Sequence, residues 1–267
     1  MLDVLVNVDE ARDDAAIIRL GMDIGRRHRG FVTGLRIVDA YPLAIAIPGA
    51  LVVLDAEERE AKEQRAWWDG LCRRHKVAGA WEVIRGIRLP ILARRSCLAD
   101  LTIDRLPSAG NGMLVSMDNV TRTLLAGTSP MLLVPSVWNG SLRQARILVA
   151  WNSSAESTRA VRAALPFLRA AEQIRILDGA CDESPGLLPP PLPLAGWLTR
   201  EGVPGRVVKR LASTGHVGEA LLDEACAMDA DLLVMGAWGH SRIGEWLLGG
   251  ATHHVLREAN LPVLLAH

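Results

Sequence analysis

The fold of this 267-residue chain is decided by one stretch, Ala230-Asp-Leu-Leu-Val-Met-Gly236-Ala-Trp-Gly239-His-Ser-Arg-Ile-Gly244-Glu-Trp-Leu-Leu-Gly249-Gly250-Ala-Thr252. Its nearly all-apolar start, residues 231–235, predicts a central parallel strand covered on both faces. Five glycines then follow within fifteen residues, and the last two are expected to open a helix. Such glycines let the backbone approach a ligand closely, and a helix N-terminus favours phosphate. The stretch therefore predicts a phosphate-binding turn in an α/β fold.

The second half of the chain repeats the first. Residues 2–9 match residues 145–152, each a short apolar strand that ends in a polar turn. Strands and helices alternate after both, which implies right-handed crossovers and a doubly wound parallel sheet. We therefore predict two tandem α/β domains with five-stranded parallel sheets, at residues 1–138 and 139–267. Ligands bind such sheets beyond the carboxyl ends of the strands.

Local patterns predict several elements. Ser153 and Glu156 have the spacing of a capping box at a helix start, and Pro166 is expected to kink that helix. A short helix is expected around Trp197. In the first half, the apolar residues 43–54 are expected to form a buried or lid-like loop, and a charged helix is expected over about residues 56–76.

Composition excludes several functions. Lys plus Arg and Asp plus Glu both number 30, so no net field attracts nucleic acid or an anionic membrane. The four cysteines form no CxxC pair, which argues against a disulfide framework and a zinc site. The chain also lacks the HExxH motif of zinc-dependent proteases. The N-terminus lacks a signal-peptide pattern, and no apolar run is long enough to span a bilayer. These features predict a cytoplasmic protein without nucleic-acid, membrane or metal partners.

The glycine-rich stretch also differs from the common catalytic motifs. The chain has no GxGxxG, and Gly250 stands where a P-loop would place its lysine. A nucleophile elbow around Ser241 would need a glycine at Ile243. We therefore predict a binding protein and not an enzyme.

The spacing resembles that of the universal stress proteins, whose ATP-binding members carry Gly-x2-Gly-x9-Gly-Ser/Thr after the fourth strand. Gly236, Gly239 and Gly249 fit this pattern, and the resemblance extends to residues 150–152 and 255–265. It implies an adenine nucleotide α-hydrolase-like fold and a role in the stress response.

The resemblance also implies a ligand, ATP or AMP, and a site for it. The implied contacts are phosphates at Gly239, Gly249, Gly250 and Thr252, ribose near Gly236, adenine by Ala150 and Leu177, and Asn152 at the strand end. Gly250 replaces a Ser or Thr of the family pattern, and Asn152 replaces an aspartate. Trp151 and Trp238 flank the crevice, where they either stack on the base or fill its place.

The first copy keeps Asp9 after its first strand, but residues 100–112 show no matching glycine motif. Its site is expected to be degenerate. Residues 1–138 are expected to pair with the second domain as a built-in partner, much as single-domain family members form homodimers, and a homodimer of the whole chain stays open.

Two alternatives remain from the sequence. The chain is a slow ATP hydrolase if Glu245 positions a water at the γ-phosphate. It is a scaffold for protein or apolar ligands, centred on residues 43–54, if the tryptophans close the crevice. His240 is a further residue that could touch a phosphate.

Overall fold

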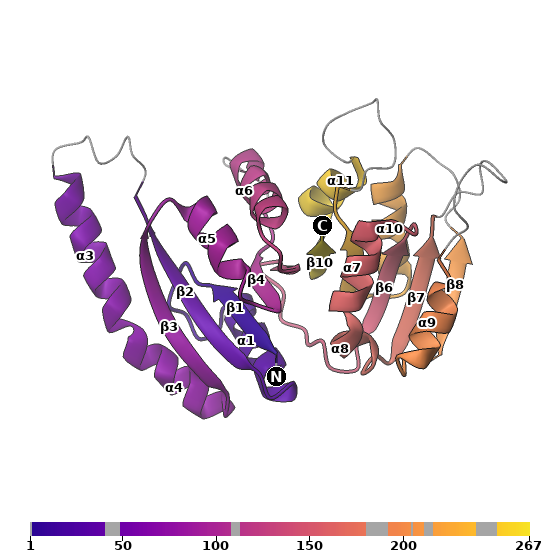
Figure 1. Cartoon of the computed structure of the whole chain (residues 1–267), viewed down its shortest axis with the longest axis horizontal. Coiled ribbons are helices and arrows are strands. Elements are labelled where there is room, and N and C mark those ends of the chain that lie inside the picture. Colours follow the sequence, from indigo (N-terminus) through magenta and orange to yellow (C-terminus); the bar gives the residue numbers. More distant parts are fainter. Residues whose placement is uncertain are drawn as a thin grey trace. The chain divides into compact units, whose positions relative to one another are not determined.

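The computed structural model shows two α/β units (Figure 1). The structure describes residues 2–40, 49–107, 113–179, 192–203, 205–210, 216–238 and 250–267. One unit comprises Met1–Arg105 with Leu114–Val137, and the other comprises Leu106–Met113 with Trp138–His267. The α/β fold with tandem parallel sheets, expected from the internal repeat, is confirmed.

The N-terminal unit has a parallel sheet in the order β3-β2-β1-β4-β5. Its strands are β1 (Asp3–Asn7), β2 (Phe31–Asp39), β3 (Ala78–Gly86), β4 (Leu101–Arg105) and β5 (Met131–Val134). Its helices are α1 (Ala16–Arg27), α3 (Ala50–Glu63), α4 (Arg65–His75), α5 (Arg88–Ser96) and α6 (Met113–Ala126).

Helix α3 corrects the expectation of a loop over residues 43–54. Residues 50–54 form its first turns, while 41–48 lie outside the described part of the chain. Gly49 precedes the helix with φ of 84°, a conformation that glycine adopts without strain and that lets a helix begin directly after a proline-glycine pair. The charged helix expected over 56–76 is two helices that meet at Gln64.

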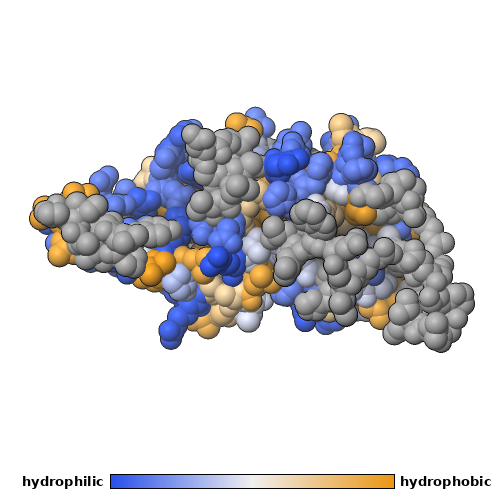
Figure 2. Space-filling model, turned by 90° about the horizontal axis from the view of Figure 1, so that it is seen from above, coloured by the Kyte–Doolittle hydropathy of each residue, from blue (hydrophilic) through white to orange (hydrophobic). Residues whose placement is uncertain are grey.

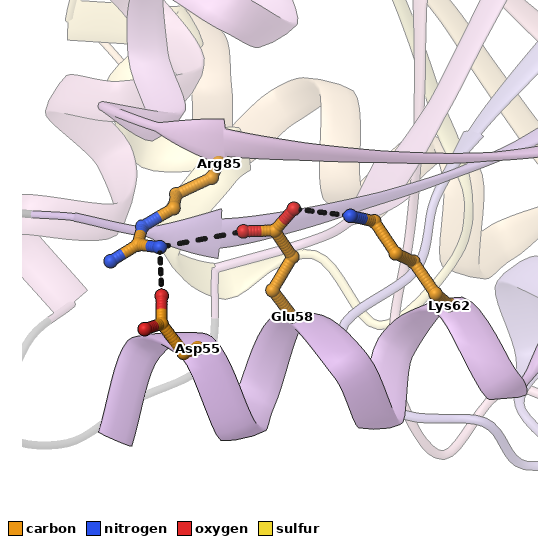
Figure 3. A network of polar contacts seen from close by, with 4 residues as sticks. All are labelled: Asp55, Glu58, Lys62 and Arg85. Carbon is orange, nitrogen blue, oxygen red and sulfur yellow. Dashed lines mark hydrogen bonds and ion pairs between the residues drawn. The ribbon is translucent and has the colours of Figure 1, made fainter. Parts of the chain in front are cut away.

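A polar network fastens α3 to β3 (Figure 3). Arg85 of β3 donates to Asp55 at 2.6 Å and reaches Glu58 at 3.5 Å, and Lys62 donates to Glu58 at 2.6 Å. Next to it, the indole of Trp81 donates to the Ala61 carbonyl at 2.8 Å. These contacts explain why the charged face of α3 lies along the edge strand.

The first turns of α3 also carry exposed apolar side chains: Leu51, Val52 and Val53. Hydrophobic surface is visible around the start of α3 (Figure 2).

The C-terminal unit has a parallel sheet in the order β10-β9-β6-β7-β8. Its strands are β6 (Arg146–Trp151), β7 (Gln173–Asp178), β8 (Arg206–Arg210), β9 (Leu232–Gly236) and β10 (Val263–Ala266). Its helices are α7 (Ala155–Ala163), α8 (Leu165–Leu168), α9 (Leu194–Arg200), α10 (Val217–Ala227) and α11 (Gly250–Glu258). The apolar run of β9 is fully buried, as a central parallel strand should be.

The start and end of α7 differ from the sequence expectations. Ser154, and not Ser153, caps the helix: its Oγ accepts a hydrogen bond from the Ser157 amide at 3.1 Å. The helix ends at Ala163, and Pro166 lies in the first turn of the separate helix α8. A proline is tolerated there because the first amides of a helix have no intrahelical partner. Instead of the expected kink within one helix, the chain therefore forms two separate helices.

Within the described residues, the structure contains no helix long and apolar enough to cross a membrane.

Candidate functional site

The C-terminal unit has a cavity of about 610 Å³ at the carboxyl edge of its sheet. Ala150 of β6, Leu177 of β7 and Gly236 of β9 lie at its base. The strand order reverses on either side of β6, so the cavity lies where doubly wound sheets bind ligands. Its volume is within the range of small-molecule sites, roughly 300 to 1,000 Å³.

Six of the eight residues expected from the sequence line this cavity: Ala150, Asn152, Leu177, Gly236, Gly250 and Thr252. The other two, Gly239 and Gly249, lie outside the described residues, as do His240 and Glu245. The structure thus brings together residues from the ends of three strands and from the start of α11.

Three helices present their N-termini to the cavity. Ser154, Glu156 and Ser157 belong to the start of α7, Val217 to Glu219 to that of α10, and Gly250 to Thr252 to that of α11. The first amides of a helix point outward without intrahelical partners, and the helix dipole adds positive potential there. The serine cap occupies one of these amides on α7, whereas His216 before α10 provides no side-chain cap. The start of α10 is therefore better suited to bind an anion than that of α7, and the start of α11 packs beside it.

The connections place the starts of α10 and α11 opposite α7. Right-handed crossovers from β6 to β7 and from β8 back to β9 put α7 and α10 on opposite faces of the sheet. In agreement, α10 packs against α11, while α7 packs against β9 and β10.

Gly236 permits a close approach of β9 to α7. A β-carbon at Gly236 would lie 2.4 Å from the Ser157 amide nitrogen and 2.8 Å from the Glu156 β-carbon. The glycine expected beside a ribose is therefore also needed for packing, and it brings the start of α7 to the edge of the cavity.

Two buried polar side chains line the cavity without a hydrogen bond to any described residue. They are Glu156, 6% exposed, and Thr252, 4% exposed. Thr252 was expected here, but the sequence assigned Glu156 to a capping box. The sequence does show a glutamate in the first helical turn after β6. It does not show that this glutamate is buried, so the residue was not predicted to line the site. Neither residue contributes a fully buried polar atom without a partner, so these side chains are open to a ligand or water in the cavity.

The two tryptophans leave the cavity open. Trp151 and Trp238 both line it, and about 610 Å³ remains. Trp238 has φ of 51°, which is uncommon for a bulky residue, and Ser153 has φ of 61° at the matching turn after β6. Left-handed residues thus follow both strands, as often happens at ligand sites.

The matching edge of the N-terminal unit carries an ion cluster. Arg88 at the start of α5 pairs with Asp9 at 2.7 Å, and its amide donates to Asp39 at 3.4 Å. Burial raises the pKa of Asp104 on β4 to about 6, although the Arg88 guanidinium acts to lower it. Charged side chains of the unit itself therefore stand at the carboxyl ends of β1, β2 and β4.

Throughout the described ranges, no three His, Cys, Asp or Glu side chains gather closely enough to hold a metal ion.

Comparison with known proteins identifies relatives of this arrangement. The model of the universal stress protein family matches residues 145–267. A universal stress protein of Synechocystis sp. is 46% identical over 50 residues, which cover 19% of this chain and 17% of that protein. The match therefore spans less than a fifth of that relative's length.

Solved structures share the whole fold. A universal stress protein from Archaeoglobus fulgidus DSM 4304 aligns with a TM-score of 0.75 and 14% identity over 99% of this chain and 96% of its own. A functionally unknown protein from Pseudomonas aeruginosa PAO1 aligns with a TM-score of 0.60 and 12% identity over 99% and 92%. Identities this low establish the fold alone. The family match is confined to residues 145–267, so the C-terminal part of the chain is similar to the universal stress proteins, and the fold of the whole chain is shared with a solved member.

Proposed function

We propose that the C-terminal domain, residues 139–267, binds an adenine nucleotide, ATP or AMP, and acts in a cytoplasmic stress response by binding and not by turnover. The observation that carries the proposal is the convergence of apolar strand ends and the N-termini of α10 and α11 on one cavity. A flat base and a phosphate group are the two ligand parts that such walls favour.

In the proposed arrangement the base lies over Ala150 and Leu177, which are direct partners on neighbouring strands. The phosphates lie at the starts of α10 and α11, where Thr252 adds a buried hydroxyl. Gly239 and Gly249 contribute backbone amides, as the family spacing implies. Because Gly250 supplies no hydroxyl, backbone amides carry most of the phosphate binding.

Binding without hydrolysis is favoured by the residues around the cavity. No Lys or Arg is among its described lining residues, and phosphoryl transfer depends on such charges or on metal ions. Glu245 is the carboxylate that a hydrolase would need, and only turnover measurements test it.

The N-terminal domain, residues 1–138, is assigned an architectural role. Its ion cluster around Arg88 supports this assignment, because the carboxylates of Asp9 and Asp39 would repel phosphate at that edge. The expected pairing of the two domains and a homodimer of the chain belong to the same proposal.

One experiment tests the function. Purified full-length protein is incubated with labelled ATP, ADP and AMP, and the retained nucleotide and the released phosphate are measured over hours. We expect retention of ATP or AMP without phosphate release. Release that stops in Glu245→Gln while retention persists would favour the hydrolase, and retention at background for all three would favour the scaffold.

A further inference from the structure

The cavity of the C-terminal unit carries a negative charge on the wall opposite its anion-binding helices. Glu156 lies in the first turn of α7 and is buried, and the dipole of that helix favours a carboxylate there. The described part of the chain offers this carboxylate neither a hydrogen bond nor an ion pair. A carboxylate that lines the cavity without a protein partner can accept hydrogen bonds from donors that a ligand brings.

The position of Glu156 defines which part of a ligand it meets. Its β-carbon lies beside Gly236 at the end of β9, and β6 separates β9 from β7. With strands about 4.8 Å apart, the glutamate is roughly 10 Å across the sheet from Leu177 on β7. The apolar floor over β6 and β7 is thus displaced from the carboxylate.

The start of α7 with Glu156 and the starts of α10 and α11 differ in chemistry, and this difference indicates which part of a ligand donates to Glu156. Phosphate is repelled by Glu156 and attracted by the free amides at the starts of α10 and α11, where the carboxylate of Glu219 is exposed to solvent. A base over Ala150 and Leu177 lies to the other side. In a nucleotide, the part that joins base to phosphate is the sugar, whose hydroxyls are hydrogen-bond donors.

We propose that the Glu156 carboxylate accepts hydrogen bonds from the ribose hydroxyls, and that it makes this site select ribonucleotides over deoxyribonucleotides. The inference rests on the proposed nucleotide site and adds a specificity-determining residue to it. The site chooses its ligand by the sugar as well as by the base and phosphate.

The test compares sugars in the full-length protein by calorimetric titration. The ligands are ATP, 2′-deoxy-ATP and 3′-deoxy-ATP. The three matching monophosphates are measured as well, in the presence of EDTA, so that no divalent cation can bridge the ligand and the Glu156 carboxylate. A hydrogen bond to a charged group predicts that at least one deoxy form binds about tenfold more weakly. In Glu156→Gln the ratio is expected to fall below about threefold, because a neutral amide bonds a hydroxyl less strongly.

Glu219→Gln is the matched control. Glu219 also lines the cavity, but it is exposed and lies on α10, so its variant should keep the wild-type ratio. Equal binding of ribo and deoxy forms by the wild type would overturn the inference and leave nucleotide binding intact. An undiminished ratio in Glu156→Gln would overturn it as well. If no nucleotide binds at all, the proposed function falls, and the inference falls with it.

Discussion

The side-chain position of Gly236 is closed by the backbone of Ser157: a β-carbon there would lie 2.4 Å from the Ser157 amide nitrogen. This approach joins the end of β9 to the start of α7, and it sets the edge of the cavity.

Gly236→Ala is therefore expected to destabilise the C-terminal unit by about 1–3 kcal/mol, because backbone atoms cannot move aside as a flexible side chain can. Urea denaturation of the variant measures the change. Gly250→Ala is the control, since the described chain places no atom within 4 Å of a β-carbon there. Equal stability of Gly236→Ala and wild type would show that β9 and α7 do not meet as described.

Ser154 caps α7 through its hydrogen bond from the Ser157 amide. Ser154→Ala should cost about 1 kcal/mol of stability, as loss of a helix N-cap typically does. Ser153→Ala should cost less, because the capping box expected at that position is absent. Thermal denaturation of the two variants compares them directly, and a larger loss in Ser153→Ala would contradict the assigned cap.

Asp104 should make the N-terminal unit less stable as pH rises. Its pKa is raised from 3.8 to about 6 by burial. Between these values the folded unit holds a proton that the unfolded chain has released. Stability is therefore greatest below pH 3.8 as far as this group is concerned, and it falls by on the order of 3 kcal/mol by the time pH passes 6.

Hydrogen-exchange protection of β4 at about pH 4.5 and about pH 7.5 measures this effect within the unit. Asp104→Asn should remove the dependence and raise protection at the higher pH. Protection that increases with pH in the wild type would contradict the assignment.

Gly250→Ser should tighten nucleotide binding. The added hydroxyl enters the cavity at the start of α11, where the described residues leave room for it, and it restores the group that the family pattern carries. A hydrogen bond to phosphate predicts a gain of about tenfold in Kd for ATP. Gly250→Ala adds the carbon without the hydroxyl, and an equal gain in both variants would attribute the effect to the helix and not to the ligand.

Much of the fold was readable from the sequence, because an apolar run such as residues 231–235 has few alternatives to a buried strand. The predicted starts and ends of helices were less accurate. The apolar residues 43–54 were expected to form a loop, whereas a helix begins directly after Gly49. The helix cap of α7 was assigned to Ser153 instead of Ser154, because each of these adjacent serines has a hydroxyl that could accept the hydrogen bond from the first turn.

The candidate site was readable where strand ends and glycines define it, as at Ala150 and Gly236. Glu156 was missed because burial depends on the approach of β9, which follows from packing between distant segments. A glutamate near a helix start is ordinarily a solvated partner of the helix dipole.

Calorimetric titration of the full-length chain with ATP and with AMP tests the central claim most directly. We expect one nucleotide bound per chain, and loss of binding in Ala150→Trp, which fills the cavity floor. Ala195→Trp, an exposed position on α9 outside the cavity lining, should bind as the wild type does. The absence of saturable binding at about millimolar nucleotide, or undiminished binding in Ala150→Trp, would contradict the assignment of this cavity.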